Sequence, residues 1–464
     1  MKRVAVINVV GLSTSLVGNS TPAIAEMTRK GASAPIRPAF PAVTCAAQAN
    51  YLTGKRPRDH GIVGNGWYDR SLAEVQFWRQ SDHLVQAPKL WDELRARDPQ
   101  FTCAKLFWWY NMYSSVDYSI TPRPIYPADG RKVFDIYTWP FSIRGEIKAD
   151  LGEFPFPAFW GPAAGVASAK FTPDAASRWI AESAKWTERK YSPALSLVYL
   201  PHLDYCLQRL GPKHPDIADH LRQIDAIVAD LVSFFRTRSV QVVLLSEYAI
   251  TPVTTPIHLN RAFRDQGWLA VKDELGLELL DCGASKVFAV ADHQIAHIYL
   301  NDRLLEGNVR KLLANTPGVE QVLGAPEKAA LGIDHERAGD LIAVASSKAW
   351  FTYYYWLDDP LAPDFARTVD IHRKPGYDPV ELFLDPEQKW IKLKIAWRLL
   401  QKKLGWRMLM DVIPLQANLV QGSHGRVDNS PTDQPILIVD QPAFPLPDQL
   451  DSTEVYPLLR SLAC

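Results

Sequence analysis

A threonine at the expected start of a helix is the residue of this chain best placed to do chemistry. Thr44 comes directly before a run of small and helix-favouring residues, Cys45 to Leu52, and Gly54 follows as a helix-ending residue. The first N–H groups of a helix are unpaired and carry the positive end of its dipole, so they can hold a phosphate group. The Thr44 hydroxyl would then either attack phosphorus or only cap the helix, and the local residue types leave both roles open.

The residues around Thr44 resemble those of a known enzyme family. The runs TCAAQANYLTG, RPRDHGIVGN and WYD, between residues 44 and 69, are similar to the nucleophile region of the nucleotide pyrophosphatase/phosphodiesterase branch of the alkaline phosphatase superfamily. In that family a Thr attacks phosphorus and an Asn binds a phosphate oxygen. The resemblance implies that Thr44 is the nucleophile and that Asn65 binds phosphate.

The same resemblance implies a metal site with an incomplete ligand set. Asp204 matches a metal-binding Asp of the family, and His424 in the run GSHG matches a metal-binding His. The other ligand positions are changed: Gln208 stands for His, Glu247 for Asp, Tyr248 for His and Val10 for Asp. Zinc prefers nitrogen and sulfur ligands, whereas oxygen-rich sets suit manganese or magnesium. We therefore expect a divalent cofactor of one of these three metals, as one or two ions, with a site that binds no metal as the alternative.

Further polar residues lie near expected strand ends or loops and are second choices for the missing ligands. They are Asn8, His202, His258, Asp292 and His293. Asn8 comes two residues before Val10, so both side chains point to the same side of a strand. A single His in such a place is more often a hydrogen-bonded structural residue than a ligand.

A basic run later in the chain is a candidate for substrate binding. His372, Arg373 and Lys374 precede the pair Pro375–Gly376 and could contact an anionic substrate. A charge cluster exposed to solvent on an aromatic loop explains the same residues equally well.

Three functional hypotheses follow. The first is a hydrolase or transferase that acts on a phosphate ester or diester of a small organic molecule through Thr44, with metal assistance. The second is a binding or scaffold protein that keeps the phosphate-binding fold but has lost catalysis, as the residues at Val10 and Tyr248 would allow. In the third, Cys45 is the nucleophile, but the C-x-P-x-R signature of the sulfatases in the same superfamily is absent.

The elements that must position these residues alternate between strands and helices. Strand patterns occur at residues 4–10, 102–109, 194–200, 240–245, 287–290, 297–300, 340–345 and 436–439, and helix patterns at 22–30, 45–52, 88–97, 173–187 and 217–235. His202, Leu203 and Asp204 are predicted to form a polar turn after one of the strands. Asp204 and Glu247 thus follow strands, at the sheet edge where open α/β proteins bind ligands.

This alternation predicts an α/β fold, and the resemblance makes it an alkaline phosphatase-like sandwich with a mostly parallel central sheet flanked by helices. We expect one catalytic domain over residues 1–464. Its Pro-rich and aromatic segment at about 111–165 is predicted to form an irregular cap, and about 350–410 an accessory segment.

Composition restricts the partners and the compartment. The 51 basic and 51 acidic residues give no net charge, which argues against a nucleic-acid binder. Five widely spaced cysteines and a short apolar N-terminal run predict a cytoplasmic protein without a disulfide framework. Residues 389–410 form a basic amphipathic pattern that could contact a membrane surface peripherally, although a packed surface helix is the interpretation that we favour. The expected partner is therefore a small phosphate ester.

Overall fold

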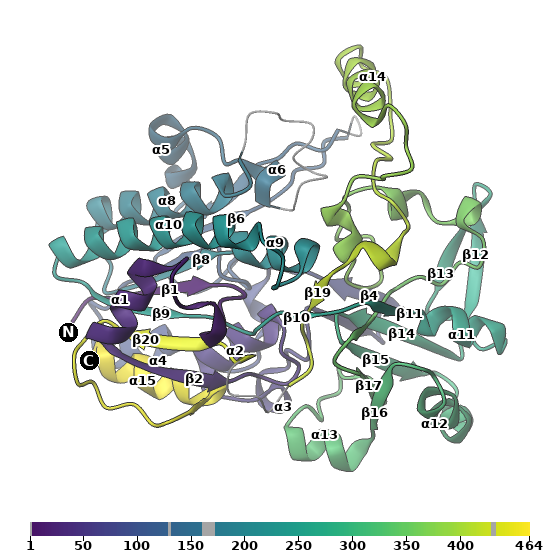
Figure 1. Ribbon diagram of the computed structural model, residues 1–464, viewed down its shortest axis with the longest axis horizontal. Helices are drawn as coiled ribbons and strands as arrows, with labels where there is room; N and C mark the ends of the chain where they lie inside the picture. The colour runs from purple at the N-terminus through teal and green to yellow at the C-terminus, as the bar shows by residue number, and fades with distance from the viewer. Residues whose placement is uncertain (1, 129–130, 160–171, 428–432) are drawn as a thin grey trace.

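The structure, a computed structural model, describes residues 2–128, 131–159, 172–427 and 433–464. Its centre is a nine-stranded sheet with helices on both faces (Figure 1). The strands in spatial order are β21 (Leu450–Asp451), β2 (Ala32–Arg37), β20 (Ile436–Val439), β9 (Gln241–Leu245), β1 (Val4–Val9), β8 (Leu195–Leu200), β5 (Cys103–Leu106), β6 (Tyr118–Pro122) and β7 (Ile136–Trp139).

The middle of this sheet is parallel and fully buried. Strands β9, β1, β8, β5 and β6 run in one direction, and Val4 of β1 lies opposite Leu195 of β8 and Gln241 of β9. Every residue of β1 is buried, as expected for a strand that helices cover on both faces. Strands β20 and β7 are antiparallel to their neighbours. The predicted mostly parallel sheet is confirmed.

Helices pack on both faces of the central sheet. One face carries α1 (Pro22–Lys30), α8 (Ala175–Tyr191), α9 (His202–Leu210) and α10 (Ile217–Thr237), and the other carries α2 (Thr44–Thr53), α4 (Leu90–Arg97) and α15 (Val455–Ala463) (Figure 1). The polar turn predicted at residues 202–204 is wrong, because α9 begins at His202 and its apolar side packs against α10. Asp204 therefore lies in the first turn of a helix.

A second lobe is built around an antiparallel sheet. Its strand order is β14 (Val287–Asp292), β15 (Ile295–Leu300), β17 (Leu341–Ala345) and β16 (Val319–Leu323). Around it lie the helices α3 (Pro57–His60), α11 (Leu259–Asp265), α12 (Glu306–Ala314) and α13 (Ala325–Leu331). Pairs of short strands accompany them: β3 (Gly66–Asp69) with β4 (Glu74–Phe77), β10 (Thr251–Pro252) with β19 (Gly422–Ser423), β11 (Thr255–Ile257) with β18 (Ala349–Phe351), and β12 (Ala270–Glu274) with β13 (Leu277–Asp281).

The two lobes share an apolar interface. It joins residues of α2, such as Cys45 and Ala49, to Ile295 and Ile342 of the second sheet. A single domain over the whole chain stays a prediction, since each sheet also has a large hydrophobic cluster of its own.

The expected cap is more regular than its composition indicated. Within its described part, β6 and β7 extend the central sheet, and α5 (Ser142–Leu151) and α6 (Phe156–Phe159) pack against α8. The remaining residues of the predicted 111–165 segment, 129–130 and 160–165, lie outside the described part of the chain. The first part of the predicted 350–410 segment, from Trp350 to Leu384, contributes to the core of the second lobe, and α14 (Ile391–Lys403) lies in its last part. No helix in the described residues is long and apolar enough to cross a membrane.

Candidate active site

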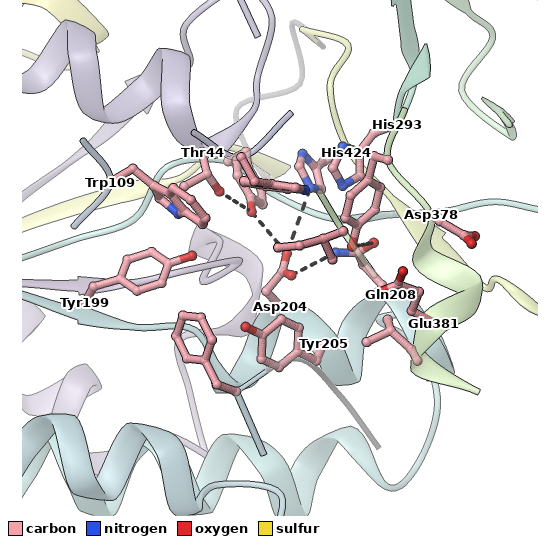
Figure 2. A pocket seen from close by; sticks show the side chains of 16 residues that line it. Thr44, Trp109, Tyr199, Asp204, Tyr205, Gln208, His293, Asp378, Glu381 and His424 are labelled. Atoms are coloured by element: carbon pink, nitrogen blue, oxygen red, sulfur yellow. Dashed lines mark hydrogen bonds and ion pairs between the residues drawn. The ribbon is translucent and has the colours of Figure 1, made fainter. Parts of the chain in front are cut away.

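Thr44 is the first residue of α2, and its hydroxyl does not cap the helix. The capping position belongs to Val43, which has extended backbone angles, and no side chain accepts a hydrogen bond there. The Thr44 hydroxyl instead lies 3.1 Å from the hydroxyl of Tyr248 (Figure 2). Thr44 is thus directed toward a pocket between the lobes, which agrees with a chemical role better than with capping.

Asn65 holds the start of α2 in place. Its Oδ1 accepts a hydrogen bond from the backbone N–H of Cys45 (3.1 Å). Its own Nδ2 and backbone N–H donate to the carboxylate of Asp292, at 3.0 and 2.8 Å. The first-turn N–H expected to bind phosphate is therefore bonded to Asn65, and Asn65 is itself buried. A direct phosphate contact of Asn65 stays a prediction.

Asp204 is the carboxylate to which the Thr44–Tyr248 pair is hydrogen-bonded through Tyr248. Tyr248 donates from its hydroxyl to Asp204 Oδ1 (3.1 Å), and Gln208 donates from Nε2 to Asp204 Oδ2 (2.8 Å). The line Thr44–Tyr248–Asp204 thus joins the expected nucleophile to a carboxylate through one phenol (Figure 2). Burial raises the pKa of Asp204 to about 7, because a desolvated carboxylate is costly.

Glu247 follows β9 and is held by two amides. Asn8 donates from Nδ2 and Gln48 from Nε2 to the same oxygen, Oε1, each at 2.6 Å. Burial raises the pKa of Glu247 to about 8 even though both hydrogen bonds favour the charged form. Among the described residues the second oxygen, Oε2, has no hydrogen-bond partner within the usual distance, although the nearby Thr44 hydroxyl also favours the charged form of this carboxylate. Asn8 therefore joins the site, but as a donor to Glu247.

Two buried histidines stack at the other side of the pocket. The ring of His424 lies 3.6 Å from that of Tyr248 and 3.7 Å from that of His293. His424 donates from Nδ1 to the carbonyl of Ala42 (2.8 Å), and His293 Nδ1 lies 2.9 Å from Asp292 Oδ1. In both rings Nε2 has no partner. Burial lowers the pKa of each well below its usual value, so both rings are neutral.

Aromatic side chains form much of the pocket wall. Thr44, Asp204 and His424 lie near one another, and Asp378 and Glu381 lie on the side away from Thr44 (Figure 2). The pocket contains about 630 Å³ of space, part of which is open to solvent. Its lining residues are Thr44, Trp78, Trp109, Phe159, Tyr199, Asp204, Tyr205, Gln208, Tyr248, His293, Ile371, Tyr377, Asp378, Glu381, Leu382 and His424. Such a site can stack a flat ring of an organic molecule while its phosphate group lies near Thr44.

Three of the expected substrate contacts are not brought to this pocket. His372 and Arg373 line a separate cavity, and Arg373 pairs with Asp364 at 3.0 Å. Lys374 is buried, with its ammonium 2.6 Å from both Asp378 and Glu381. One ammonium held between two buried carboxylates balances one of their two charges, and Lys374 does not line the pocket. The positions of these three residues therefore do not support the substrate-binding role that was predicted for them.

The third nucleophile hypothesis meets an unsuitable environment. Cys45 is fully buried and faces away from the pocket lining. Burial raises the pKa of its thiol well above its usual value, which disfavours the reactive thiolate. All five cysteines are free thiols.

The residues of the pocket fit one metal ion better than two. His424 Nε2 carries a lone pair, because Nδ1 is the donating nitrogen, and lies 3.9 Å from Asp204 Oδ1. Two such facing acceptors can share a cation that lies about 2.1 Å from each. Near Glu247 the ligands are poorer. Tyr248 stands where the resemblance implies a His, and its hydroxyl is already bonded to Asp204. Val10, which stands where the resemblance implies an Asp, has no ligand atom.

Other potential ligands lie apart from this place. Gln208 directs its amide N–H to Asp204 and accepts a hydrogen bond from Tyr377 on Oε1 (3.1 Å), so it acts as a hydrogen-bonding residue here. Within the described part of the chain, the one group of His, Cys and acidic residues whose ligand atoms lie within 4.8 Å of one another is His202, Cys206 and His220, outside the pocket. His258 bonds to Thr352 in the second lobe.

Sequence reasoning named His293 only as a second-choice ligand and did not identify the aromatic side chains that line the pocket. His293 and Tyr377, which stack at 3.8 Å, come from the second lobe and from the segment after it. His293 lies in the two-residue turn between β14 and β15 with φ of 63°, and no motif marks it as a site residue. The sequence feature that could have identified it is the polar pair Asp292–His293 at the tip of a hairpin of two apolar strands.

Comparison with known proteins identifies the family. The model of the type I phosphodiesterase / nucleotide pyrophosphatase family matches residues 4–378. The chain belongs to this family. The match extends from β1 through the Thr44 helix, Asp204 and Glu247 to the pocket residue Tyr377.

Solved structures share the fold across the whole chain. Murine ectonucleotide pyrophosphatase / phosphodiesterase 5, in an inactive form in complex with AMP, is 14% identical with a TM-score of 0.58, and the match covers 100% of this chain and 95% of that one. Phosphonoacetate hydrolase from Sinorhizobium meliloti 1021, in complex with phosphonoformate, is 14% identical with a TM-score of 0.62, covering 100% and 96%. The alkaline phosphatase-like fold is thereby confirmed.

A curated relative is similar over a shorter region. An uncharacterized pyrophosphatase/phosphodiesterase of Schizosaccharomyces pombe is 22% identical over 244 residues, which is 50% of this chain and 41% of that protein. The match therefore spans about two fifths of the length of this relative.

Proposed function

We propose that this protein hydrolyses a phosphate ester or diester of a small organic molecule, with Thr44 as the nucleophile. The observation that carries the proposal is the hydrogen-bonded line from the Thr44 hydroxyl through Tyr248 to Asp204, at the polar end of an aromatic pocket. Family membership supports the reaction type. A scaffold that lost catalysis has no need to keep this line, so we do not favour that alternative.

In the first step, Thr44 Oγ1 forms a bond to phosphorus while the bond from phosphorus to the leaving oxygen breaks. The hydroxyl proton of Thr44 passes to the oxygen of Tyr248, and Tyr248 passes its own proton to Asp204 Oδ1, along the two 3.1 Å hydrogen bonds. The leaving oxygen departs as an anion and takes its proton from solvent. In the second step, the oxygen of a water molecule forms a bond to phosphorus while the bond from phosphorus to Thr44 Oγ1 breaks, and the water releases one proton to solvent. The proton on Asp204 returns through Tyr248 to Thr44 Oγ1, which restores the hydroxyl.

A divalent ion, which members of this family generally require, would be held by Asp204 and His424 and would supply positive charge beside the phosphoryl group. A nitrogen and a carboxylate oxygen suit zinc or manganese better than magnesium. His424 is fixed for this task by its hydrogen bond to Ala42, which sets the tautomer and the ring orientation.

The aromatic wall would bind the organic part of the substrate. AMP is the ligand in the murine structure and phosphonoformate the ligand in the bacterial one. Nucleotide esters and simple aryl phosphodiesters are therefore the first substrates that we would offer to this protein. We place the protein in the cytoplasm, because four of its five free thiols are buried without a disulfide.

The test compares Thr44→Ala with the matched control Thr44→Ser. Hydrolysis of bis(4-nitrophenyl) phosphate and of thymidine 4-nitrophenyl phosphate is measured with added zinc or manganese. We expect Thr44→Ala to lose about a thousandfold or more in kcat, whereas Thr44→Ser, which keeps a hydroxyl, retains most of it. Undiminished turnover by Thr44→Ala would refute the assignment of the nucleophile.

A further inference from the structure

Helix α14 extends away from both sheets and is held to the protein on one side only (Figure 1). Lys394 and Arg398 donate hydrogen bonds to the carboxylate of Asp411, at 2.8 and 3.1 Å, and thereby fix the helix to the irregular segment that follows it. Ile395 is the buried residue of this helix. The position of α14 is thus defined, while most of its surface faces outward.

The outward surface of α14 carries an apolar stripe. Its members recur at helical spacing, and we call them the α14 stripe: Trp390, Leu393, Trp397, Leu400 and Leu404. Trp390 is 77% exposed, Leu393 65% and Trp397 51%. Trp406 and Leu409, just after the helix, are also exposed. An apolar stripe of this length normally packs on a core, so its exposure indicates a surface that binds something apolar.

Positive charge borders the stripe. With about 100° of rotation per residue, Lys392 and Lys403 lie on one flank of the α14 stripe. Lys389, Lys402 and Arg407 add to the charge around it, and in the described chain no carboxylate pairs with any of these five residues. The long methylene stems of lysine can lie beside an apolar layer while the ammonium groups reach a polar one. This combination complements an apolar layer bounded by anions.

We propose that α14 is a peripheral membrane-binding helix that places its stripe in an anionic lipid surface. Exposed Trp and Leu with flanking Lys, on a helix too short to span a bilayer, match the requirements for a helix that lies in the interface. Anionic headgroups meet the unpaired lysines, whereas a second copy of the same helix would bring like charges together. The packed surface helix favoured from the sequence alone is replaced by this interpretation. The inference does not depend on the catalytic proposal.

Flotation with lipid vesicles tests this proposal. The full-length protein is mixed with vesicles of phosphatidylglycerol and phosphatidylcholine, or of phosphatidylcholine alone, at low and high salt. We expect binding to the anionic vesicles that weakens with added salt, and little binding to the neutral ones. Trp397→Ser/Leu400→Ser and Lys392→Glu/Lys403→Glu should each lower the partition coefficient about tenfold or more.

The matched control places the same change on a remote exposed leucine. Leu304→Ser, in the second lobe, removes an apolar side chain that is 93% exposed and should leave vesicle binding unchanged. Melting temperature and hydrolysis of a water-soluble substrate show whether each variant is folded. Equal binding of wild type and Trp397→Ser/Leu400→Ser would overturn the proposal. So would a dimer that Trp397→Ser/Leu400→Ser dissociates while no form of the protein binds vesicles.

Discussion

On one side of the pocket, which we call the open side, the buried ring of His424 directs an unpartnered Nε2 at Asp204, 3.9 Å away. On the opposite, closed side, Glu247 Oε1 already accepts two amide hydrogen bonds, and Tyr248 has its hydroxyl where an imidazole would offer a lone pair. Both sides correspond to ligand positions of the same family.

We interpret the difference between the two sides as the reduction of a two-ion site, the arrangement that the sequence resemblance implies. Replacing a metal ligand by a hydrogen-bond donor removes the lone pair of that ligand. The new donor also bonds to a lone pair of the neighbouring carboxylate, which is then less available to a metal ion. Amide donors reach Glu247 from two directions, and the phenol of Tyr248 binds Asp204 from the closed side. The open side retains a place for a cation, whereas neutral donors stabilise the carboxylate of the closed side.

The largest effect is expected at the carboxylate that both sides share. Asp204→Asn keeps the shape of the side chain but removes the proton acceptor and the charged ligand. We expect kcat for aryl phosphodiester hydrolysis to fall about a thousandfold, with an unchanged fold by circular dichroism. A variant within tenfold of wild type would show that Asp204 is not part of the reaction.

Breaking the line at its middle tests the role of the phenol. Tyr248→Phe keeps the ring that stacks on His424 but removes the hydroxyl between Thr44 and Asp204. We expect a loss of about a hundredfold in kcat with little change in KM, since proton transfer contributes in the transition state. A change confined to KM would assign Tyr248 to substrate binding instead.

The open side should lose its metal when the imidazole is removed. For wild type we expect zinc to raise the melting temperature. For His424→Gln we expect the affinity for zinc to fall about a hundredfold and this rise to be lost. Gln421→Ala, at a residue with an exposed side chain three positions earlier, is the control. Identical zinc dependence in His424→Gln and wild type would place the metal elsewhere.

The smallest effect is expected on the closed side. Glu247→Gln removes a carboxyl group that burial already holds largely protonated at neutral pH, with its pKa raised to about 8. Both amides can still donate to the remaining carbonyl oxygen, so we expect kcat to change by less than about tenfold. A loss as large as that of Asp204→Asn would mean that Glu247 binds an ion and that the two sides are equivalent.

The sequence allowed the central sheet and the start of the site to be predicted, because apolar strands and the Thr44 helix are local patterns. It failed at residues 202–204, where a polar start conceals a helix whose Leu203 and Leu207 pack against the core. It also could not show that Lys374 pairs with both Asp378 and Glu381, because that pairing depends on the helical turn Pro379–Leu382, which brings the two carboxylates to the same ammonium group.

The hydrogen-bonding roles of Gln208 and His293 could not be predicted from the sequence for another reason. Both were considered as ligands, yet the role of each depends on rotamers and partners contributed by distant segments, Tyr377 for Gln208 and Asp292 for His293. Only packing between the two lobes brings these groups together. Family resemblance identified which positions matter, and the structure determined what the residues at those positions do.

A crystal structure of the protein with zinc and orthovanadate tests the central claim most directly. We predict vanadium bonded to Thr44 Oγ1 and, within the pocket, a single anomalous zinc peak between Asp204 and His424, with none beside Glu247. Vanadate bound away from Thr44, or a second zinc ion held by Glu247, would contradict the account.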